Sequence, residues 1–295
     1  MKTICCLIAL WLLTLTYSCK QQNEVKKMPG STDSLEIIAE AKEKARLEKR
    51  KEIEALNIAD SIYLDDLLNK ALLTAEGYKK SDKFEHRYVE TKPDSSYQVT
   101  VEISSGFYFT EKNPHLRIKR KTPNDTYIDF FSKTANRFQK VVAHQQWNMT
   151  YVNDTIRDIN GDGLKDFVVN WYGSNGCCLK GFSDVYLLRS DKKAFSEKFE
   201  FINPTFSPRE KTIRGICYGQ PGDTEMYKYK WREETIDTLE FVSYEKNKKG
   251  EKTGKIIISN QRPHEDHFKI IKRLNAVPKE YKQIQGYDWF TGKDY

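Results

Sequence analysis

Residues 97–103 read YQVTVEI, and this stretch decides the fold class. Apolar and polar residues alternate in it with a period of two, as in a strand with one buried and one solvated face. Similar short runs separated by turn residues continue along the chain, without an alternating strand–helix pattern. The sequence therefore predicts a mainly β domain over residues 84–295, built as a sandwich or an irregular β-propeller. We expect strands at 97–103, 116–119, 127–131, 138–142, 167–171, 184–188, 212–217, 226–231, 238–244 and 255–259.

A helical segment is predicted before the β domain, over residues 34–80. Strong helix formers fill residues 34–76, and neither proline nor glycine interrupts them. The stretch between Glu40 and Glu54 is nearly saturated with charge, which keeps a helix in water. We expect this segment to form a stalk for the β domain. Its second half carries an apolar stripe that must pack on the following domain or on a partner helix: Ile58, Ile62, Leu67, Leu68, Ala71, Leu72 and Ala75.

The N-terminus has the layout of a secretory signal. Lys2 precedes an apolar run at residues 4–15, which is too short to cross a bilayer as a helix. A small residue, Ser18, then precedes Cys19, and the chain turns polar at once. We therefore expect a signal peptide at 1–18, cleavage before Cys19, and a flexible tether at 19–33.

This arrangement resembles the signals of bacterial lipoproteins, in which the cysteine at the new N-terminus carries lipid. The resemblance implies that Cys19 anchors the protein to a membrane, in the outer membrane or elsewhere in the cell envelope. An ordinary cleaved signal and an uncleaved anchor are the alternatives.

Residues 158–166, DINGDGLKD, follow the spacing D-x-N-x-D-G-x-x-D. Calcium prefers six or seven hard oxygen ligands, and a tight loop supplies them from alternate residues. Gly163 allows the sharp turn at the sixth position, while Val169 replaces the glutamate that closes an EF-hand. A turn without metal is the alternative. We expect a structural Ca²⁺ ion, bound by Asp158, Asn160, Asp162, the carbonyl group of Leu164, and Asp166.

The loop resembles those of FG-GAP and VCBS repeats, which occur in β-propeller blades, although here it occurs once. A single loop with the strands that follow it is similar to a group of exported proteins with an irregular propeller. That group includes immunity lipoproteins that inhibit wall-degrading effectors of rival bacteria. The resemblance covers about residues 95–260, and only the loop is specific.

Three cysteines remain after the signal is removed and Cys19 carries lipid: Cys177, Cys178 and Cys217. Disulfides persist in exported proteins. We expect Cys217 to pair with Cys177 or Cys178, which closes a loop of about 40 residues and contributes about 3–4 kcal/mol in the chain-entropy description. A strained bond between Cys177 and Cys178 is the alternative.

The net charge of +7 is spread along the chain, without a basic face interleaved with aromatics, which argues against nucleic-acid binding. The sequence contains no GxSxG, HExxH, P-loop or SxxK motif. The pair His264 and His267 follows Pro263 in a polar stretch, which indicates a solvated loop. We therefore expect a protein that binds the membrane through its lipid and a protein or cell-wall partner through its β domain. A cell-envelope hydrolase with an unrecognised site and a structural subunit of an outer-membrane complex are the alternatives.

Overall fold

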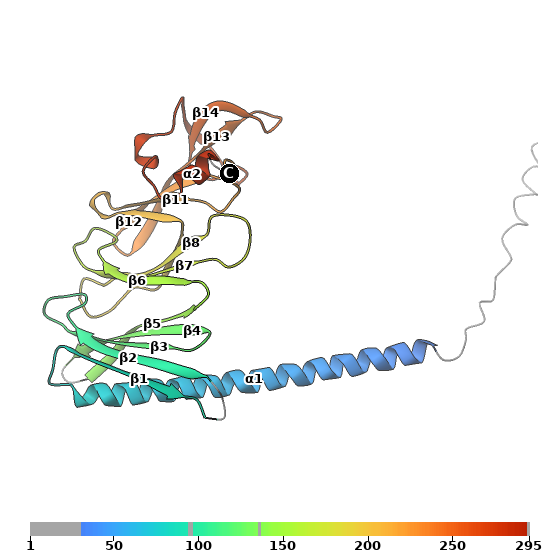
Figure 1. The fold of residues 1–295 in the computed structure, drawn as a ribbon. Coiled ribbons are helices and arrows are strands. Elements are labelled where there is room, and N and C mark those ends of the chain that lie inside the picture. The colour runs from blue at the N-terminus through green and yellow to red at the C-terminus, as the bar shows by residue number, and fades with distance from the viewer. Residues whose placement is uncertain (1–30, 94–96, 135–136, 294–295) are drawn as a thin grey trace, which may run out of the picture. The chain divides into compact units, whose positions relative to one another are not determined.

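The computed structural model describes residues 31–93, 97–134 and 137–293 (Figure 1). The predicted signal peptide, Cys19 and the tether up to residue 30 lie outside these residues. Contacts divide the chain into two compact units, Met1–Ile62 and Tyr63–Tyr295. The long helix α1 (Ser31–Gly77) contributes to both, so its last turns belong to the β unit.

The β unit consists of three antiparallel sheets, in each of which the strands follow their order in the chain. The first sheet has five strands: β1 (Phe84–Thr91), β2 (Gln98–Gly106), β3 (His115–Lys121), β4 (Asp125–Thr134) and β5 (Arg137–Trp147). The second has four: β6 (Tyr151–Arg157), β7 (Asp166–Tyr172), β8 (Gly181–Tyr186) and β9 (Phe199–Ile202).

The third sheet has six strands and carries the short helical elements. The strands are β10 (Pro204–Ser207), β11 (Thr212–Ile216), β12 (Met226–Arg232), β13 (Thr235–Lys246), β14 (Lys252–Ser259) and β15 (Ile270–Leu274). Two 3₁₀ turns, η1 (Pro208–Glu210) and η2 (Lys279–Tyr281), and the helix α2 (Tyr287–Thr291) accompany them.

The first sheet is covered on one face by the end of α1. Side chains of β2 such as Val101 and Ile103 share a core with buried residues of the helix, including Leu67 and Ala71. The predicted apolar stripe is therefore packed only in its second part, because Ile62 remains exposed. Burying these side chains of α1 stabilises its last turns by removing apolar surface from water.

The other core layers lie between successive sheets. Phe130 of the first sheet packs with Phe167 of the second, whereas the next residue, Val168, packs with Ile213 of the third. Successive side chains of a strand point to opposite faces, so β7 contributes to both layers. The continuous apolar run at 167–169 is the sequence mark of a strand buried on both faces.

The mainly β class predicted from the sequence is confirmed, as is a helix at the N-terminal side of it. In the described residues the strands form three separate sheets, and none closes into a barrel. No helix among these residues is both long and apolar enough to cross a membrane. Five strands were not predicted, β1, β6, β9, β10 and β15.

Candidate functional site

The predicted calcium loop is the connection between β6 and β7. Arg157 pairs with Asp166 at the base of this hairpin, so residues 158–165 form the loop. Gly163 has a φ of +84° with open space around it, so the backbone conformation alone favours glycine there. At Gly161 a Cβ atom would lie 2.0 Å from the carbonyl oxygen of Pro208. The loop is thus packed directly against η1, the 3₁₀ turn that connects β10 and β11 of the third sheet.

Side-chain oxygens of the loop accept hydrogen bonds from its own backbone. The carboxylate of Asp158 accepts the N–H of Gly161 at 2.7 Å and that of Gly163 at 3.0 Å. Asp162 accepts the N–H of Leu164 at 2.7 Å. These contacts orient the side chains toward the inside of the turn, as Asx turns do.

Asp166 is completely buried and connects the loop to the rest of the second sheet. Its two carboxylate oxygens accept the N–H groups of Ile159 and Leu188, each at 2.9 Å. Burial raises the pKa of Asp166 to about 7, and repulsion from Asp162 and Asp158 adds to this effect. Asp166 therefore holds the start of the loop against the segment that follows β8.

The residues of the loop fit calcium in chemistry and in charge. Asp158, Asp162 and Asp166 supply carboxylate oxygens and Asn160 an amide oxygen, which are the hard ligands that calcium prefers. In the described part of the chain no lysine or arginine forms an ion pair with any of the three carboxylates. Among the residues that the structure describes, no three acidic, histidine or cysteine side chains are grouped closely enough to hold a metal. Each oxygen still has a lone pair beyond its N–H partner.

The expected disulfide to Cys217 is absent, because all three described cysteines are free thiols. Cys178 packs with Ile216, whereas Cys217 lies in the core between the second and third sheets. Adjacent positions at the end of β11 face opposite sides of the sheet, which separates Cys217 from Cys178. Cys177 and Cys178 place their sulfur atoms 3.2 Å apart without a bond.

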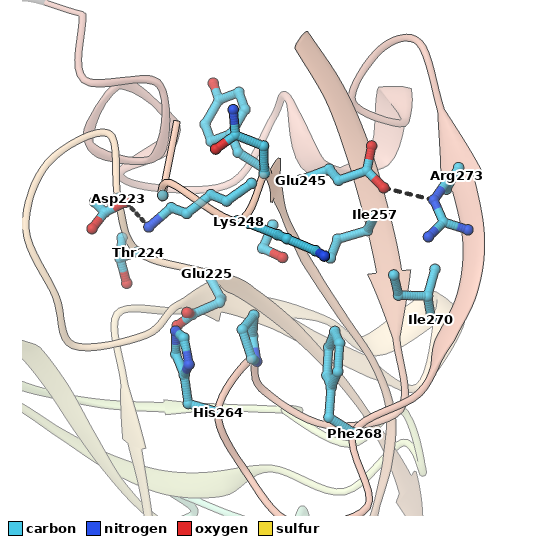
Figure 2. A pocket seen from close by; sticks show the side chains of 16 residues that line it. Asp223, Thr224, Glu225, Glu245, Lys248, Ile257, His264, Phe268, Ile270 and Arg273 are labelled. Atoms are coloured by element: carbon cyan, nitrogen blue, oxygen red, sulfur yellow. Dashed lines mark hydrogen bonds and ion pairs between the residues drawn. The ribbon is translucent and has the colours of Figure 1, made fainter. Parts of the chain in front are cut away.

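A cavity of about 560 Å³ lies beside β13, β14 and β15, and Figure 2 shows the side chains that line it. Phe268, Ile257 and Ile270 form apolar parts of its wall. His264 also lines the cavity, and both it and His267 have positive φ angles, of 78° and 64°. The histidine pair thus belongs to a constrained loop over the cavity, although the described chain groups no metal ligands there.

The acidic side chains around this cavity all have basic partners. Arg273 donates to Glu245 at 2.6 Å (Figure 2). Lys246 forms an ion pair with Asp223. Glu225 forms an ion pair with Arg262 at 2.9 Å. The hydrogen bond from Arg273 lowers the pKa of Glu245. Glycoside hydrolysis needs a carboxylic acid whose pKa is raised. The lowered pKa of Glu245 is the opposite of this requirement.

An exposed apolar patch lies where the first sheet continues into the second. It consists of Trp147, Met149, Val152 and Tyr172, and Met149 is 77% exposed. The N–H of Tyr172 donates to the carbonyl oxygen of Thr150 at 2.8 Å, which places these segments side by side. The sequence does not reveal this patch, because exposure depends on which side chains the sheets leave uncovered.

A buried polar cluster between the first two sheets was also missed. Lys119 of β3 donates to Asp154 at 2.6 Å and to Tyr151 at 2.8 Å. Burial opposes the ionisation of Asp154, but hydrogen bonds from Lys119 and Tyr151 outweigh it and hold its pKa below the usual value. The paired charges fix the orientation of β3 toward β6.

Comparison with known protein families, with curated proteins and with solved structures found no match for this chain.

Proposed function

We propose that this protein is a lipid-anchored protein of the cell envelope whose calcium-stabilised β domain binds a protein partner. The apolar patch is the observation that carries the binding role. Contiguous exposed apolar surface marks interaction sites on soluble domains. Tryptophan, tyrosine and methionine are enriched in protein interfaces, and the patch contains one of each, at Trp147, Tyr172 and Met149.

The calcium loop supports the proposal that calcium stabilises the β domain that carries this patch. Three carboxylates within nine residues have no basic partner in the described chain, so a divalent cation would relieve their mutual repulsion. The loop contacts η1 of the third-sheet region at Pro208, and Asp166 at the end of the loop accepts the N–H of Leu188, which follows β8. Bound calcium would therefore hold both sheets together at this point, without taking part in a reaction.

The anchor and the class of partner are proposed from the sequence. Cys19 carries the lipid, and the partner belongs to the effectors or structural proteins that act in the envelope. The resemblance to immunity lipoproteins favours inhibition of a wall-degrading effector. The unbroken chain order of strands in each of the three sheets supports the related proposal that they are blades of an irregular propeller.

The binding role can be tested by photocrosslinking in the producing cells. A photoreactive amino acid at position 172 should give one discrete adduct with a second protein after irradiation. The matched control carries the same amino acid at Val89, which is similarly exposed but lies on β1. Met149→Glu in the position-172 variant should remove the adduct, since a charge in the patch is costly to desolvate.

Adducts of equal strength from positions 172 and 89 would show that contact is unspecific and would contradict the patch. The same conclusion follows if Met149→Glu leaves the adduct unchanged. If no adduct forms at position 172, the proposal of a protein partner at this surface is wrong.

A further inference from the structure

The loop between β7 and β8 holds two neighbouring thiols, one exposed and one buried. The sulfur atoms of Cys177 and Cys178 are 3.2 Å apart, close enough for a hydrogen bond between thiol and thiolate. Cys177 is exposed, whereas Cys178 is 5% exposed. A reagent in solution therefore reaches Cys177 first, and Cys178 lies directly behind it.

The conformation of this loop is held from several sides. The N–H of Gly173 donates to the carbonyl oxygen of Lys180 at 2.9 Å and closes the base of the loop. The side chain of Asn203 donates to the carbonyl oxygen of Leu179 at 3.0 Å. Gly176 has a φ of +98°, and a Cβ there would lie 2.8 Å from the hydroxyl oxygen of Tyr218. The two thiols are thus positioned by the fold as well as by their adjacency.

A buried cation lies beside the thiols. Lys180 is 6% exposed and donates to the carbonyl oxygen of Gly176 at 3.4 Å. It forms no ion pair with a carboxylate in the described residues. A buried ammonium group needs a negative partner, and a thiolate of the pair is the anion that the loop can provide.

The side chain of Gln220 adds a direct contact to the exposed sulfur. Its Nε2 donates to Sγ of Cys177 at 3.0 Å. The hydrogen bond with Cys178, followed by that with Gln220, lowers the pKa of Cys177, and the charge of Lys180 acts in the same direction. Nucleophilic cysteines occur in such partly exposed, electropositive surroundings.

Cys217 has the opposite environment. It is buried in the core between the second and third sheets, and burial raises the pKa of its thiol to about 12. A thiol of this kind is inert, because the thiolate is the reactive form. The reactive pair is therefore Cys177 with Cys178, and Cys217 serves as an internal control.

We propose that Cys177 and Cys178 form a redox-active dithiol site that exchanges with small disulfides such as glutathione disulfide. The thiolate of Cys177 attacks one sulfur of the disulfide, forms a mixed disulfide and releases one thiolate of the reagent. Cys178 then loses its proton to solvent and attacks Sγ of Cys177, which releases the second thiolate. The protein loses two electrons and two protons, and one disulfide is reduced to two thiols.

The bond formed in this way is readily reversed. The Cα atoms of adjacent residues are about 3.8 Å apart, below the usual range for a disulfide of about 4.4–6.8 Å. Strained and exposed disulfides are the reducible ones. The site is thus suited to reversible oxidation rather than to permanent stabilisation of the fold.

The proposal is tested on the reduced full-length protein, treated with glutathione disulfide, quenched with iodoacetamide and mapped by peptide mass spectrometry. The peptide with residues 177 and 178 should be lighter by two hydrogen atoms and carry no alkyl group. The peptide with Cys217 should stay a free thiol, and Cys217→Ala should leave the result unchanged. Dithiothreitol should restore two alkylatable thiols.

Two variants assign the roles of the thiols. In Cys178→Ser the exchange should stop at the mixed disulfide, with one glutathionyl group on Cys177. In Cys177→Ser the rate of reaction at Cys178 should fall at least about tenfold, because the remaining thiol is buried. Lys180→Met should slow the wild-type reaction about threefold to tenfold at neutral pH. Lys193→Met, in an exposed turn, should not slow it.

Two results with the wild-type protein alone would overturn the proposal, so it does not depend on the folding of the variants. One is a peptide that still takes two alkyl groups after prolonged treatment with glutathione disulfide. The other is a disulfide that joins Cys217 to Cys177 or Cys178. Equal rates in Lys180→Met and the wild type would contradict the role of the buried ammonium.

Discussion

The guanidinium group of Arg120 lies 2.7 Å from the carboxylate of Asp129, and both side chains are almost completely buried beneath the last turns of α1. Arg120 also donates to the carbonyl oxygen of Leu64 in that helix at 2.5 Å. A single arginine therefore connects β3, β4 and α1. This charge lies in an apolar layer, where a buried ion without its partners would strongly destabilise the fold.

Arg120→Met should destabilise the β unit by about 3 kcal/mol, because it leaves the buried carboxylate of Asp129 with the more distant ammonium of Lys140 alone. The double variant Arg120→Met with Asp129→Leu should recover most of this loss, since two apolar side chains need no partner. Urea unfolding measures both. A double variant that is no more stable than Arg120→Met would show that the unpaired carboxylate of Asp129 is not the cause of the loss.

Gly161→Ala and Gly163→Ala should differ strongly although the two glycines lie in one loop. At position 161 the methyl group meets the carbonyl group of Pro208, so the loop must move, and we expect a loss of at least about 3 kcal/mol. At position 163 only the positive φ is unfavourable, which costs about 1 kcal/mol. Equal losses in chemical denaturation would contradict the packing of the loop on η1.

Calcium should raise the Tm of the wild-type protein by about 5–10 °C when present at about 100 times its dissociation constant. The double variant Asp158→Ala with Asp162→Ala should show no difference between calcium and chelator, because two of the three carboxylates are gone. Asp191→Ala is the matched control, since Asp191 also accepts backbone N–H groups in a turn but belongs to a different loop. A wild type that melts equally in calcium and chelator has no such site.

His115→Phe should make the protein less sensitive to acid. His115 is completely buried between Phe109 and Phe195, and its Nδ1 donates to the carbonyl oxygen of Asn113 at 3.1 Å. Burial lowers the pKa of His115 below its value of about 6.5 in the unfolded chain. The unfolded state therefore binds the proton more tightly. The neutral ring stabilises the fold above about pH 6.5, and this stability is lost as the pH falls below that value.

The comparison for His115 uses urea midpoints at about pH 7.5 and about pH 5, on either side of the unfolded pKa. The fall in stability between them should be smaller in His115→Phe than in the wild type. Some fall should remain, because burial also lowers the pKa of His144. His86→Phe, on the half-exposed strand β1, is the control. An unchanged fall in His115→Phe would mean that His115 is not responsible.

Cys19→Ala should release the protein from the membrane fraction of its producing cells, since a lipid chain supplies the attachment. Cell fractionation and immunoblotting measure the distribution, and Cys6→Ala in the apolar run is the control that should stay bound. Persistent membrane association of Cys19→Ala would rule out the lipid anchor proposed at that residue.

Local pattern was sufficient to predict several strands that have one buried face or two buried faces. The alternation at 97–103 and the apolar run at 167–169 became β2 and β7. By contrast, β6 carries mostly polar residues and is defined by its pairing with β7. A strand of that kind is stabilised by hydrogen bonds to a neighbour, which leave no periodicity to detect.

The sequence by itself determined the composition of the calcium loop and the adjacency of Cys177 and Cys178. Groups that are only a few residues apart in the chain must lie close together in space. Only the tertiary structure decided that Cys217 faces away from the pair, and that Ile62 is exposed while Leu67 is buried. The exposed apolar patch is likewise a result of how the sheets pack. Short-range spacing determines local chemistry, whereas burial depends on contacts between distant segments that no local pattern records.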